Sequence, residues 1–310
     1  LGPVQPFIEA SRSVRDLWTG SMILSWLAFC AMKPVLEQFG PTAIIYPSLR
    51  GNPLVDLWLR ERENLGERVL FPDAAHRLTP SLPVRFLALV PWGKDGDLAK
   101  ALAEDCQLGF TTAWKELAVG VKASVQSSLD GFFSGWDKHE RWDDQISKYF
   151  SVNIAVTPLH GMSIKSEDAK QHDEQLAELL SGKGLFAAAF PDAEAVRDMA
   201  RSIPKDDQPY SNLQDHAGRW QYNVERVNRL LEAQRAIRHI RTMPPPDPSE
   251  KFPQKCTLLG TFEQMGPDHL GESATFWNAA ADVTSGLSVK GVRIRKGEAL
   301  CAVGLVKRFA

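Results

Sequence analysis

The sequence lacks the short motifs that mark several classes of nucleotide-binding and metal-dependent enzymes. Its 310 residues contain no Walker A loop, no Gly-x-Gly-x-x-Gly fingerprint and no Gly-Gly-Asp-Asp turn. The common glycine-rich phosphate loops and a palm-type two-metal site are therefore not encoded in it. The longest apolar run, residues 22–32, contains Ser25 and is too short to cross a bilayer, and no signal-peptide pattern opens the sequence.

Cysteine and net charge are scarce as well. The four cysteines are widely scattered, which favours a reducing cytosol over a disulfide scaffold. We therefore expect a cytoplasmic protein without a membrane partner. The net charge of −2 gives no overall attraction to nucleic acid, so any such contact must come from local basic patches. An apolar fraction of 44% is ordinary for a soluble globular chain with a sizeable core.

The spacing of the apolar residues predicts long helices and few strands. Helical spacing covers residues 6–18 and 20–39, and Gly20 between them is expected to bend or break the helix. This order of elements predicts an α/β or α+β fold. Further helices are expected over residues 96–133, 166–181, 192–202 and 219–241, and buried strands over 42–49, 83–91 and 150–159.

A proline-rich segment, residues 243–253, is the clearest predicted boundary between domains. The unit beyond it contains Cys256 and Cys301, and each cysteine stands where a Cys-x-x-Cys knuckle would begin. The partner positions hold leucine and glycine, so only half of a tetrahedral zinc site is present. Asp268 and His269 are conceivable additional ligands, but a unit held by apolar packing without zinc is the favoured interpretation.

Three stretches are candidates for binding. A Gly-Pro turn leads into the first helix, where Gln5 could contact a base or ribose and Arg12 and Arg15 could pair with a phosphate. A purely structural role for these residues is the alternative. The predicted helix 219–241 has six arginines against two glutamates; it could contact a phosphate backbone or an acidic partner, or form a solvated face. A second basic cluster, residues 289–298, is expected to form a β-ribbon.

Five stretches, taken together, resemble one protein family. In this order and at these distances they are similar to the large subunit of type III-B (Cmr-type) CRISPR effector complexes. The similarity has gaps in a variable helical insert at about residues 93–216. The stretches are GPVQPFIEASRSVRDLWTGSMILSWL from residue 2, PTAIIYPSLRGNPLVDLWL from 41, SLPVRFLALVP from 81, KCTLLGTFEQMGP from 255 and GEALCAVGLVKRF from 297.

The resemblance implies an α+β fold. A ferredoxin-like palm of the polymerase and cyclase type is expected over residues 1–242, with the helical insert inside it. After the linker 243–253, a degenerate zinc-ribbon-like domain is expected over residues 254–310. In the family a second palm carries the Gly-Gly-Asp-Asp loop that makes cyclic oligoadenylates from ATP, and an upstream HD domain, when present, cuts single-stranded DNA. We expect this chain, which contains neither of these domains, to be a piece of a longer polypeptide.

The implied function is that of one part of an antiviral effector. The parent protein is expected to be a nucleotidyltransferase, with this piece inactive alone but contributing to ATP binding and complex assembly. ATP and Mg²⁺ are the expected cofactors of the whole protein, and the other effector subunits with guide and target RNA are its expected partners. The alternative is a structural scaffold that only binds neighbouring subunits and RNA.

The resemblance carries one set of residues, the nucleotide contacts, over to this sequence, and the two basic stretches supply a second set. Gly20 is expected to bend the first helix and Ser21 to restart it as a cap. No catalytic residue is expected, and no metal at Cys256 and Cys301. The expected nucleotide contacts are Gly2, Pro3, Gln5, Arg12, Arg15 and Ser21, and the expected contacts to nucleic acid or a partner are Arg226, Arg229, Arg235, Arg238, Arg293 and Arg295.

Overall fold

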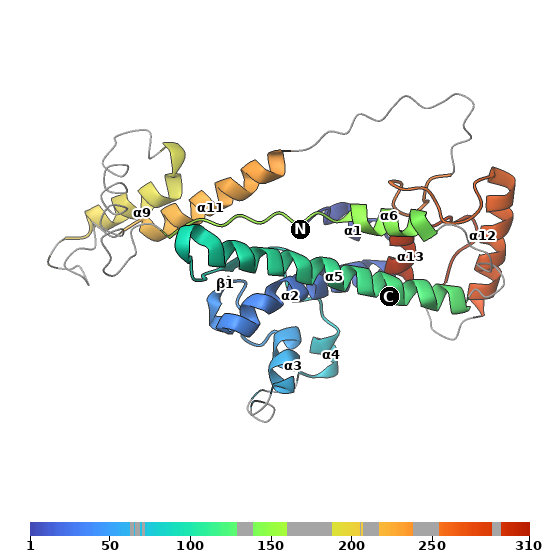
Figure 1. Ribbon diagram of the computed structural model, residues 1–310, viewed down its shortest axis with the longest axis horizontal. Coiled ribbons are helices and arrows are strands. Elements are labelled where there is room, and N and C mark those ends of the chain that lie inside the picture. The colour runs from blue at the N-terminus through green and yellow to red at the C-terminus, as the bar shows by residue number, and fades with distance from the viewer. Residues whose placement is uncertain are drawn as a thin grey trace. The chain divides into compact units, whose positions relative to one another are not determined.

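The computed structural model describes a mostly helical chain with one small sheet (Figure 1). The described residues are 1–62, 65, 69, 72–128, 139–159, 188–204, 206, 217–237, 254–286 and 293–310. They belong to two compact units. The first consists of residues 1–91, 101–152 and 243–310, and the second of residues 92–100 and 153–242. The predicted linker 243–253 lies outside the described residues, so that boundary stays a prediction.

The first unit begins with a short helix, α1 (Gln5–Glu9), and a long one, α2 (Val14–Phe39). The break between them lies at residues 10–13, not at Gly20, so the predicted bend was wrong. Ser13 is extended and caps α2, because its Oγ accepts the backbone N–H of Asp16 at 3.1 Å. The predicted cap at Ser21 was also wrong: Ser21 lies inside α2, and its Oγ donates to the carbonyl of Leu17 at 3.0 Å.

Gly20 lies inside the helix, and the absence of a side chain there makes room for a neighbouring residue. A Cβ at this position would lie 2.8 Å from Cε of Lys307. The glycine therefore permits close packing instead of introducing flexibility. Helix α2 is long and apolar enough for a membrane span, although the core helix of a soluble protein passes the same test. Its buried apolar residues include Ile23, Leu24, Leu27, Ala31, Met32, Val35 and Leu36.

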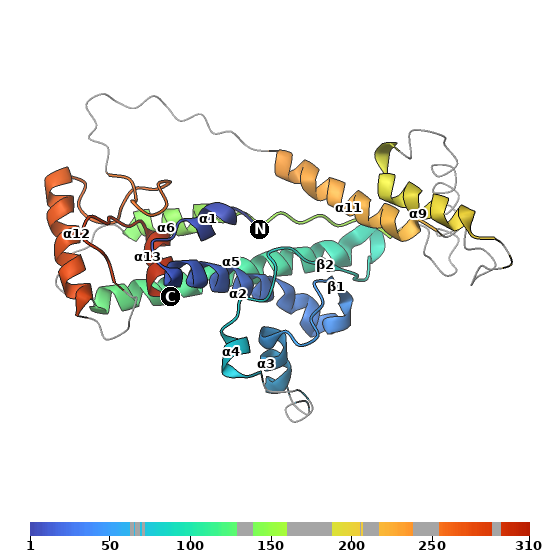
Figure 2. The same cartoon turned by 180° about the vertical axis from the view of Figure 1, so that it is seen from behind.

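A second long helix, α5 (Asp97–Ser128), lies beside α2 (Figures 1 and 2). A Cβ at Gly109 would lie 2.7 Å from the carbonyl oxygen of Cys30, so the two helix backbones approach closely there. The core next to this contact is rich in aromatic side chains. Rings whose centroids lie 4.8–5.9 Å apart belong to Phe7, Phe110, Trp114, Tyr149 and Phe150.

The sheet is smaller than the sequence predicts. Strand β1 (Ile44–Tyr46) pairs antiparallel with β2 (Leu87–Ala88), within the predicted segments 42–49 and 83–91. The predicted strand 150–159 was wrong, because only Ser151 is paired, in an isolated bridge with Gly2. A ferredoxin-type sheet is therefore not seen among the described residues. Short helices α3 (Pro53–Glu61) and α4 (Ala74–Arg77) and the 3-10 turns Pro41–Ala43 and Lys94–Gly96 complete this region.

The last described residues of the first unit are helical where a ribbon-like domain was expected. Helix α13 (Ala302–Phe309) is buried and packs against both α2 and α6 (His139–Tyr149), as the two ribbon views show. Helix α12 (Leu270–Ser285) precedes it. The predicted β-ribbon 289–298 has no strand in its described part, 293–298, which forms a turn.

The second unit contains a pair of packed helices, α9 (Pro191–Ser202) and α11 (Arg219–Ala236). Helix α11 lies within the predicted segment 219–241, and α9 begins one residue before the predicted segment 192–202. The predicted helix 166–181 falls outside the described residues. The rings of Phe190 and Tyr222 lie 4.7 Å apart in a T-shaped contact. Glu225 of α11 accepts the N–H of Ala193 at 2.9 Å, which satisfies a free donor in the first turn of α9.

Candidate functional site

The strongest polar constellation in the described residues joins the start of α2 to the end of α13. The guanidinium of Arg308 lies between the carboxylates of Asp16 and Glu298. Its Nε is 2.7 Å from Asp16 Oδ1, and its Nη2 donates to Asp16 Oδ2 at 3.0 Å. Its Nη1 donates to Glu298 Oε2 at 3.0 Å. All three side chains are at most 3% exposed, so this is a buried ion-pair network.

Arg12 extends this network to the surface. Its Nε lies 3.8 Å from Glu298 Oε1, and its Nη2 donates to the carbonyl of Thr257 at 3.0 Å. Its backbone N–H donates to Asp16 Oδ2 at 3.0 Å. The Arg12 side chain is 41% exposed, so part of the guanidinium faces solvent at the positive end of the α2 dipole.

Lys307, next to Arg308, is completely buried. Its Nζ donates to the carbonyls of Phe7, Ile8 and Ala10, and to Ser11 Oγ at 3.0 Å. The ammonium therefore satisfies carbonyl groups at the end of α1 that have no helical partner. Burial lowers the Lys307 pKa to about 8, while the nearby Asp16 raises it and Arg308 lowers it.

The structure disperses the residues predicted to contact nucleotide. Gly2 exchanges two backbone hydrogen bonds with Ser151, at 3.0 and 2.8 Å, and Gln5 begins α1 at an exposed position close after Pro3. Arg12 and Arg15 flank the first turn of α2, and Arg15 Nη2 donates to the carbonyl of Ala310 at 3.4 Å. Ser21 lies further along the helix.

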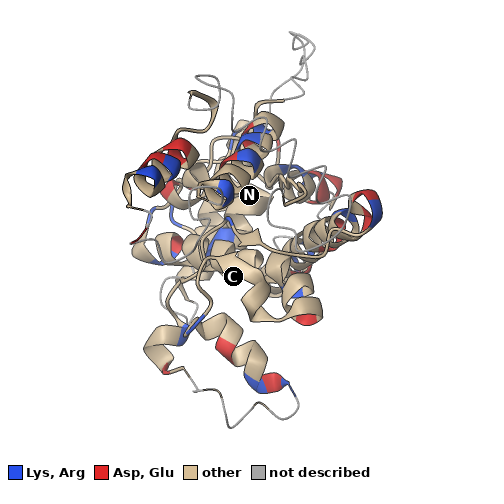
Figure 3. Cartoon of the chain, turned by 90° about the vertical axis from the view of Figure 1, so that its left-hand side faces the viewer, with Lys and Arg blue, Asp and Glu red and all other residues tan. Residues whose placement is uncertain are grey.

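The predicted basic contacts belong to both units. In α11, Arg226 Nη1 donates to the carbonyl of Pro158 at 3.4 Å, Arg229 stacks on Phe190 at 4.8 Å, and Arg235 is exposed. In the first unit, Arg293 and Arg295 are exposed beside the 293–298 turn. Arg238 lies outside the described residues. In Figure 3 the helices that face the viewer carry both blue (Lys, Arg) and red (Asp, Glu) segments of ribbon.

Cys256 and Cys301 lie together in the core, at 2% and 0% exposure. Each sulfur accepts a backbone N–H three residues ahead, from Leu259 at 3.5 Å and from Gly304 at 3.3 Å. A hydrogen bond from the Cys301 thiol lowers the pKa of Cys256 to about 6, and the same bond raises the pKa of Cys301. Within the described ranges, no three His, Cys, Asp or Glu side chains are grouped to hold a metal ion. This donor set does not fit a tetrahedral zinc site.

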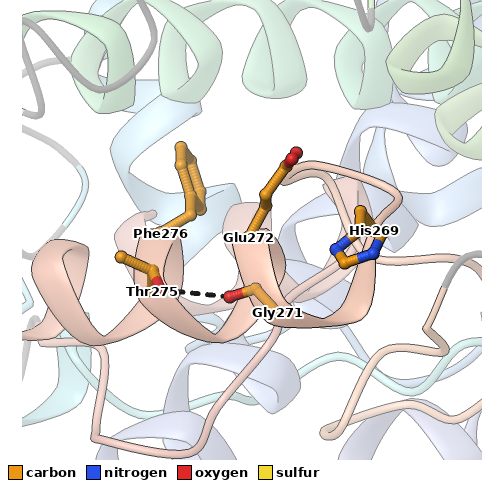
Figure 4. A pocket seen from close by; sticks show the side chains of 5 residues that line it. All are labelled: His269, Gly271, Glu272, Thr275 and Phe276. Carbon is orange, nitrogen blue, oxygen red and sulfur yellow. Dashed lines mark hydrogen bonds between the residues drawn. The ribbon is translucent and has the colours of Figure 1, made fainter.

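A shallow depression lies on the surface of α12. It is lined by His269 before the helix and by Gly271, Glu272, Thr275 and Phe276 on its first turns (Figure 4). Thr275 Oγ1 donates to the carbonyl of Gly271 at 3.0 Å, which occupies its hydroxyl within the helix. All of the lining comes from one helical segment, so the depression does not bring distant residues together.

Sequence reasoning missed Asp16, Glu298, Lys307 and Arg308. One signal was available, because "LVKRF" places two cations directly after an apolar run and "VRDLW" places an acid between apolar residues. Charges in such positions need partners if the segment is buried. The pairing of Asp16 with Arg308 is a tertiary contact across 292 positions, which periodicity does not reveal.

Residues 1–119 match the family described as the N-terminal part of CRISPR-associated protein Cmr2. The Cmr subunit Cmr2 of Pyrococcus furiosus is 40% identical over 95 residues, covering 31% of this chain and 10% of that protein. Cmr2 of Saccharolobus solfataricus is 34% identical over 214 residues, covering 57% of this chain and 20% of that protein. The chain thus spans only a tenth to a fifth of these relatives.

Two solved structures of type III-B Cmr-beta are also similar, each at 16% sequence identity. The apo state gives a TM-score of 0.48 and covers 98% of this chain and 30% of the solved chain. The state bound to cognate target RNA gives a TM-score of 0.39, with 99% and 31% covered. The family resemblance found in the sequence is confirmed by the family match and the two curated relatives.

Proposed function

Because residues 1–119 match the N-terminal part of Cmr2 and two Cmr2 subunits are similar in sequence, we propose that the chain is part of a type III-B CRISPR large subunit and works in an RNA-guided antiviral effector complex. In this proposal it forms an N-terminal part of the large subunit in the cytoplasm. The observation that carries the proposal is the family match over residues 1–119 together with the two related Cmr2 subunits. The palm-like and ribbon-like assignments of residues 1–242 and 254–310 belong to the same proposal.

The proposed contribution of this chain is a nucleotide-binding surface at the start of α2. Arg12 and Arg15 lie there next to the positive end of a 26-residue helix, where a phosphate is favoured. The buried network of Asp16, Glu298 and Arg308 fixes the backbone around Arg12, because Asp16 accepts its N–H and Glu298 lies near its guanidinium. The exposed part of Arg12 can then pair with an anion without reorganisation of the loop.

In the whole protein, ATP and Mg²⁺ would serve synthesis of cyclic oligoadenylates in a palm that this sequence does not contain. The residues of this chain would bind and orient the phosphates. Gln5 is exposed and offers an amide for the base or ribose. Proton transfer and bond formation are not assigned to any residue described here.

A non-catalytic scaffold is the second candidate, and one observation favours it. Arg12 and Arg15 already donate to carbonyl oxygens within the chain, those of Thr257 and Ala310. As a scaffold, the chain would use its surface only to bind other subunits and guide RNA. The two functions therefore differ in whether the chain binds nucleotide through these arginines.

Assembly is common to both functions and can be measured directly. We expect the tagged chain to co-purify with the other Cmr subunits and guide RNA. Reversing two charges on α11, with Arg229→Glu and Arg235→Glu, should weaken RNA retention. The slope of the logarithm of the RNA-binding constant against the logarithm of salt concentration should fall by the amount expected for about two phosphate contacts. Lys100→Glu with Lys115→Glu makes the same change of charge at exposed positions of α5 and should leave retention unchanged. Elution of the chain without subunits or RNA would contradict the proposal.

A further inference from the structure

Two cysteine side chains from distant parts of the sequence meet in the core of the first unit. Cys301 is the N-cap of α13, and Cys256 precedes a turn at residues 257–259. The backbone N–H of Thr257 donates to the carbonyl of Ala299 at 2.8 Å, which holds the two cysteine-bearing segments side by side. A Cβ built on Gly304 would lie 3.4 Å from Cys256 Sγ and 3.6 Å from Cys301 Sγ, so both sulfurs border the same small space.

The surroundings of this pair differ from those of a metal site. The partner positions hold Leu259 and Gly304, and they contribute only backbone N–H groups to the sulfurs. Tyr149 lies nearby, and burial raises its pKa, with Cys301 and Cys256 also raising it. The pair thus consists of two neighbouring thiols in an apolar core.

We propose that Cys256 and Cys301 are a redox-active dithiol that closes to an intramolecular disulfide when exposed to a small hydroperoxide. The geometry that carries the proposal is the backbone hydrogen bond that holds the residue after Cys256 beside Ala299, together with the single space that both sulfurs border. A small oxidant is specified because both sulfurs are buried, and a bulky disulfide reagent would be excluded.

The chemistry takes two steps. The Cys256 thiolate attacks the distal oxygen of the hydroperoxide; an S–O bond forms, the O–O bond breaks, and the leaving alkoxide takes a proton. Cys256 is then a sulfenic acid. The Cys301 sulfur next attacks the Cys256 sulfur, an S–S bond forms, and the sulfenic oxygen leaves as water with the Cys301 proton. Two thiols are oxidised by two electrons, which the O–O bond accepts, and an added dithiol reverses the step.

The two cysteines have different roles in these two reaction steps. N–H groups of the 256–259 turn and the Cys301 thiol stabilise negative charge on Cys256, which makes it the attacking sulfur. Cys301 stays protonated beside it and is the resolving sulfur. Burial raises the pKa of Cys30 to about 11 and that of Cys106 to about 12, so these two cysteines are controls within the same chain.

The disulfide would link the 256–265 segment covalently to α13. That helix carries Lys307 and Arg308, whose side chains hold residues 7–16. Oxidation would therefore cross-link the helix that supports the loop of Arg12 to the 256–265 segment, and reduction would remove this cross-link.

The test is peroxide treatment of the purified chain, followed by alkylation in denaturant and peptide mass spectrometry. We expect a cross-linked Cys256–Cys301 peptide, two hydrogens lighter than the sum of its parts. The pair should lose its thiols at least about tenfold faster than Cys30 and Cys106, because the thiolate is the reacting form. In Cys301→Ser, Cys256 should stop at the sulfenic acid, which dimedone added together with the denaturant labels. In Cys256→Ser, dimedone should label nothing at Cys301.

Several results would overturn the proposal. One is the absence of the cross-linked peptide while circular dichroism shows a folded chain. Others are equal loss of all four thiols, or a disulfide that joins two chains. Dimedone labelling of Cys301 in Cys256→Ser would reverse the assigned roles and contradict the proposed asymmetry.

Discussion

Removing Arg308 is the most informative perturbation of the buried network. In Arg308→Met the carboxylates of Asp16 and Glu298 remain in the core without their common cation. Breaking a buried ion pair by removing one partner costs about 3–5 kcal/mol, because an uncompensated charge stays buried. A domain of ordinary stability unfolds with about 5–15 kcal/mol, so the variant should lose a large part of its free energy of unfolding.

Urea denaturation followed by tryptophan fluorescence measures this change, with linear extrapolation to water. The matched control is Lys33→Met, which breaks the Lys33–Glu37 pair on the surface of α2. Those side chains are about half exposed and their charges are 3.6 Å apart, so the loss should stay below about 1 kcal/mol. Adding Asp16→Asn to Arg308→Met should cost less than the sum of the two single changes, because the groups interact directly. An Arg308→Met loss no larger than the control would refute the network.

Three further predictions test the junction between α2 and α13. Gly20→Ala should lower the thermal midpoint despite the helix propensity of alanine, because Lys307 Cε leaves no space for a Cβ. The control is Gly120→Ala, where no atom lies within 4 Å of the added Cβ, and it should raise the free energy of unfolding by up to about 1 kcal/mol. The folded-state pKa of Lys307 is lowered from 10.5 to about 8, so the unfolded chain binds the extra proton between these values. The free energy of unfolding should therefore gain from this group as pH rises from 8 to 10.5, and Lys307→Met should remove that gain in urea titrations. Ser13→Ala should cost about 1 kcal/mol through loss of the α2 cap, and a difference below 0.3 kcal/mol would contradict the capping role.

The comparison of expected and observed helices shows what periodicity can reveal. The apolar repeat predicts α5, α9 and α11 correctly over the described residues, because their buried faces recur with the helical period. The same rule missed α13, because eight residues are too few for the helical period to recur. It also misplaced the break before α2. Gly20 suggested flexibility, but the glycine serves close packing against Lys307.

The candidate site could be predicted only in its local parts. The sequence points to Arg12 and Arg15 as basic residues at the start of a helix, and to the cysteines as a pair without knuckle partners. It does not indicate that Arg12 shares Glu298 with Arg308, nor that both cysteine sulfurs border one small space. Arg12 and Glu298 are 286 positions apart and the two cysteines are 45 apart, so these contacts depend on tertiary packing, including that of α13 against α2.

Calorimetric titration of the chain with ATP and Mg²⁺ tests the proposed nucleotide-binding role most directly. We predict millimolar or tighter binding that is lost in Arg15→Ala and in Gln5→Ala and retained in Arg50→Ala, which removes an exposed arginine of the β1–α3 loop. Circular dichroism of each variant ensures that lost binding does not reflect unfolding. No detectable binding by the folded chain, or binding unchanged in Arg15→Ala and Gln5→Ala, would contradict the nucleotide-binding role and support the scaffold.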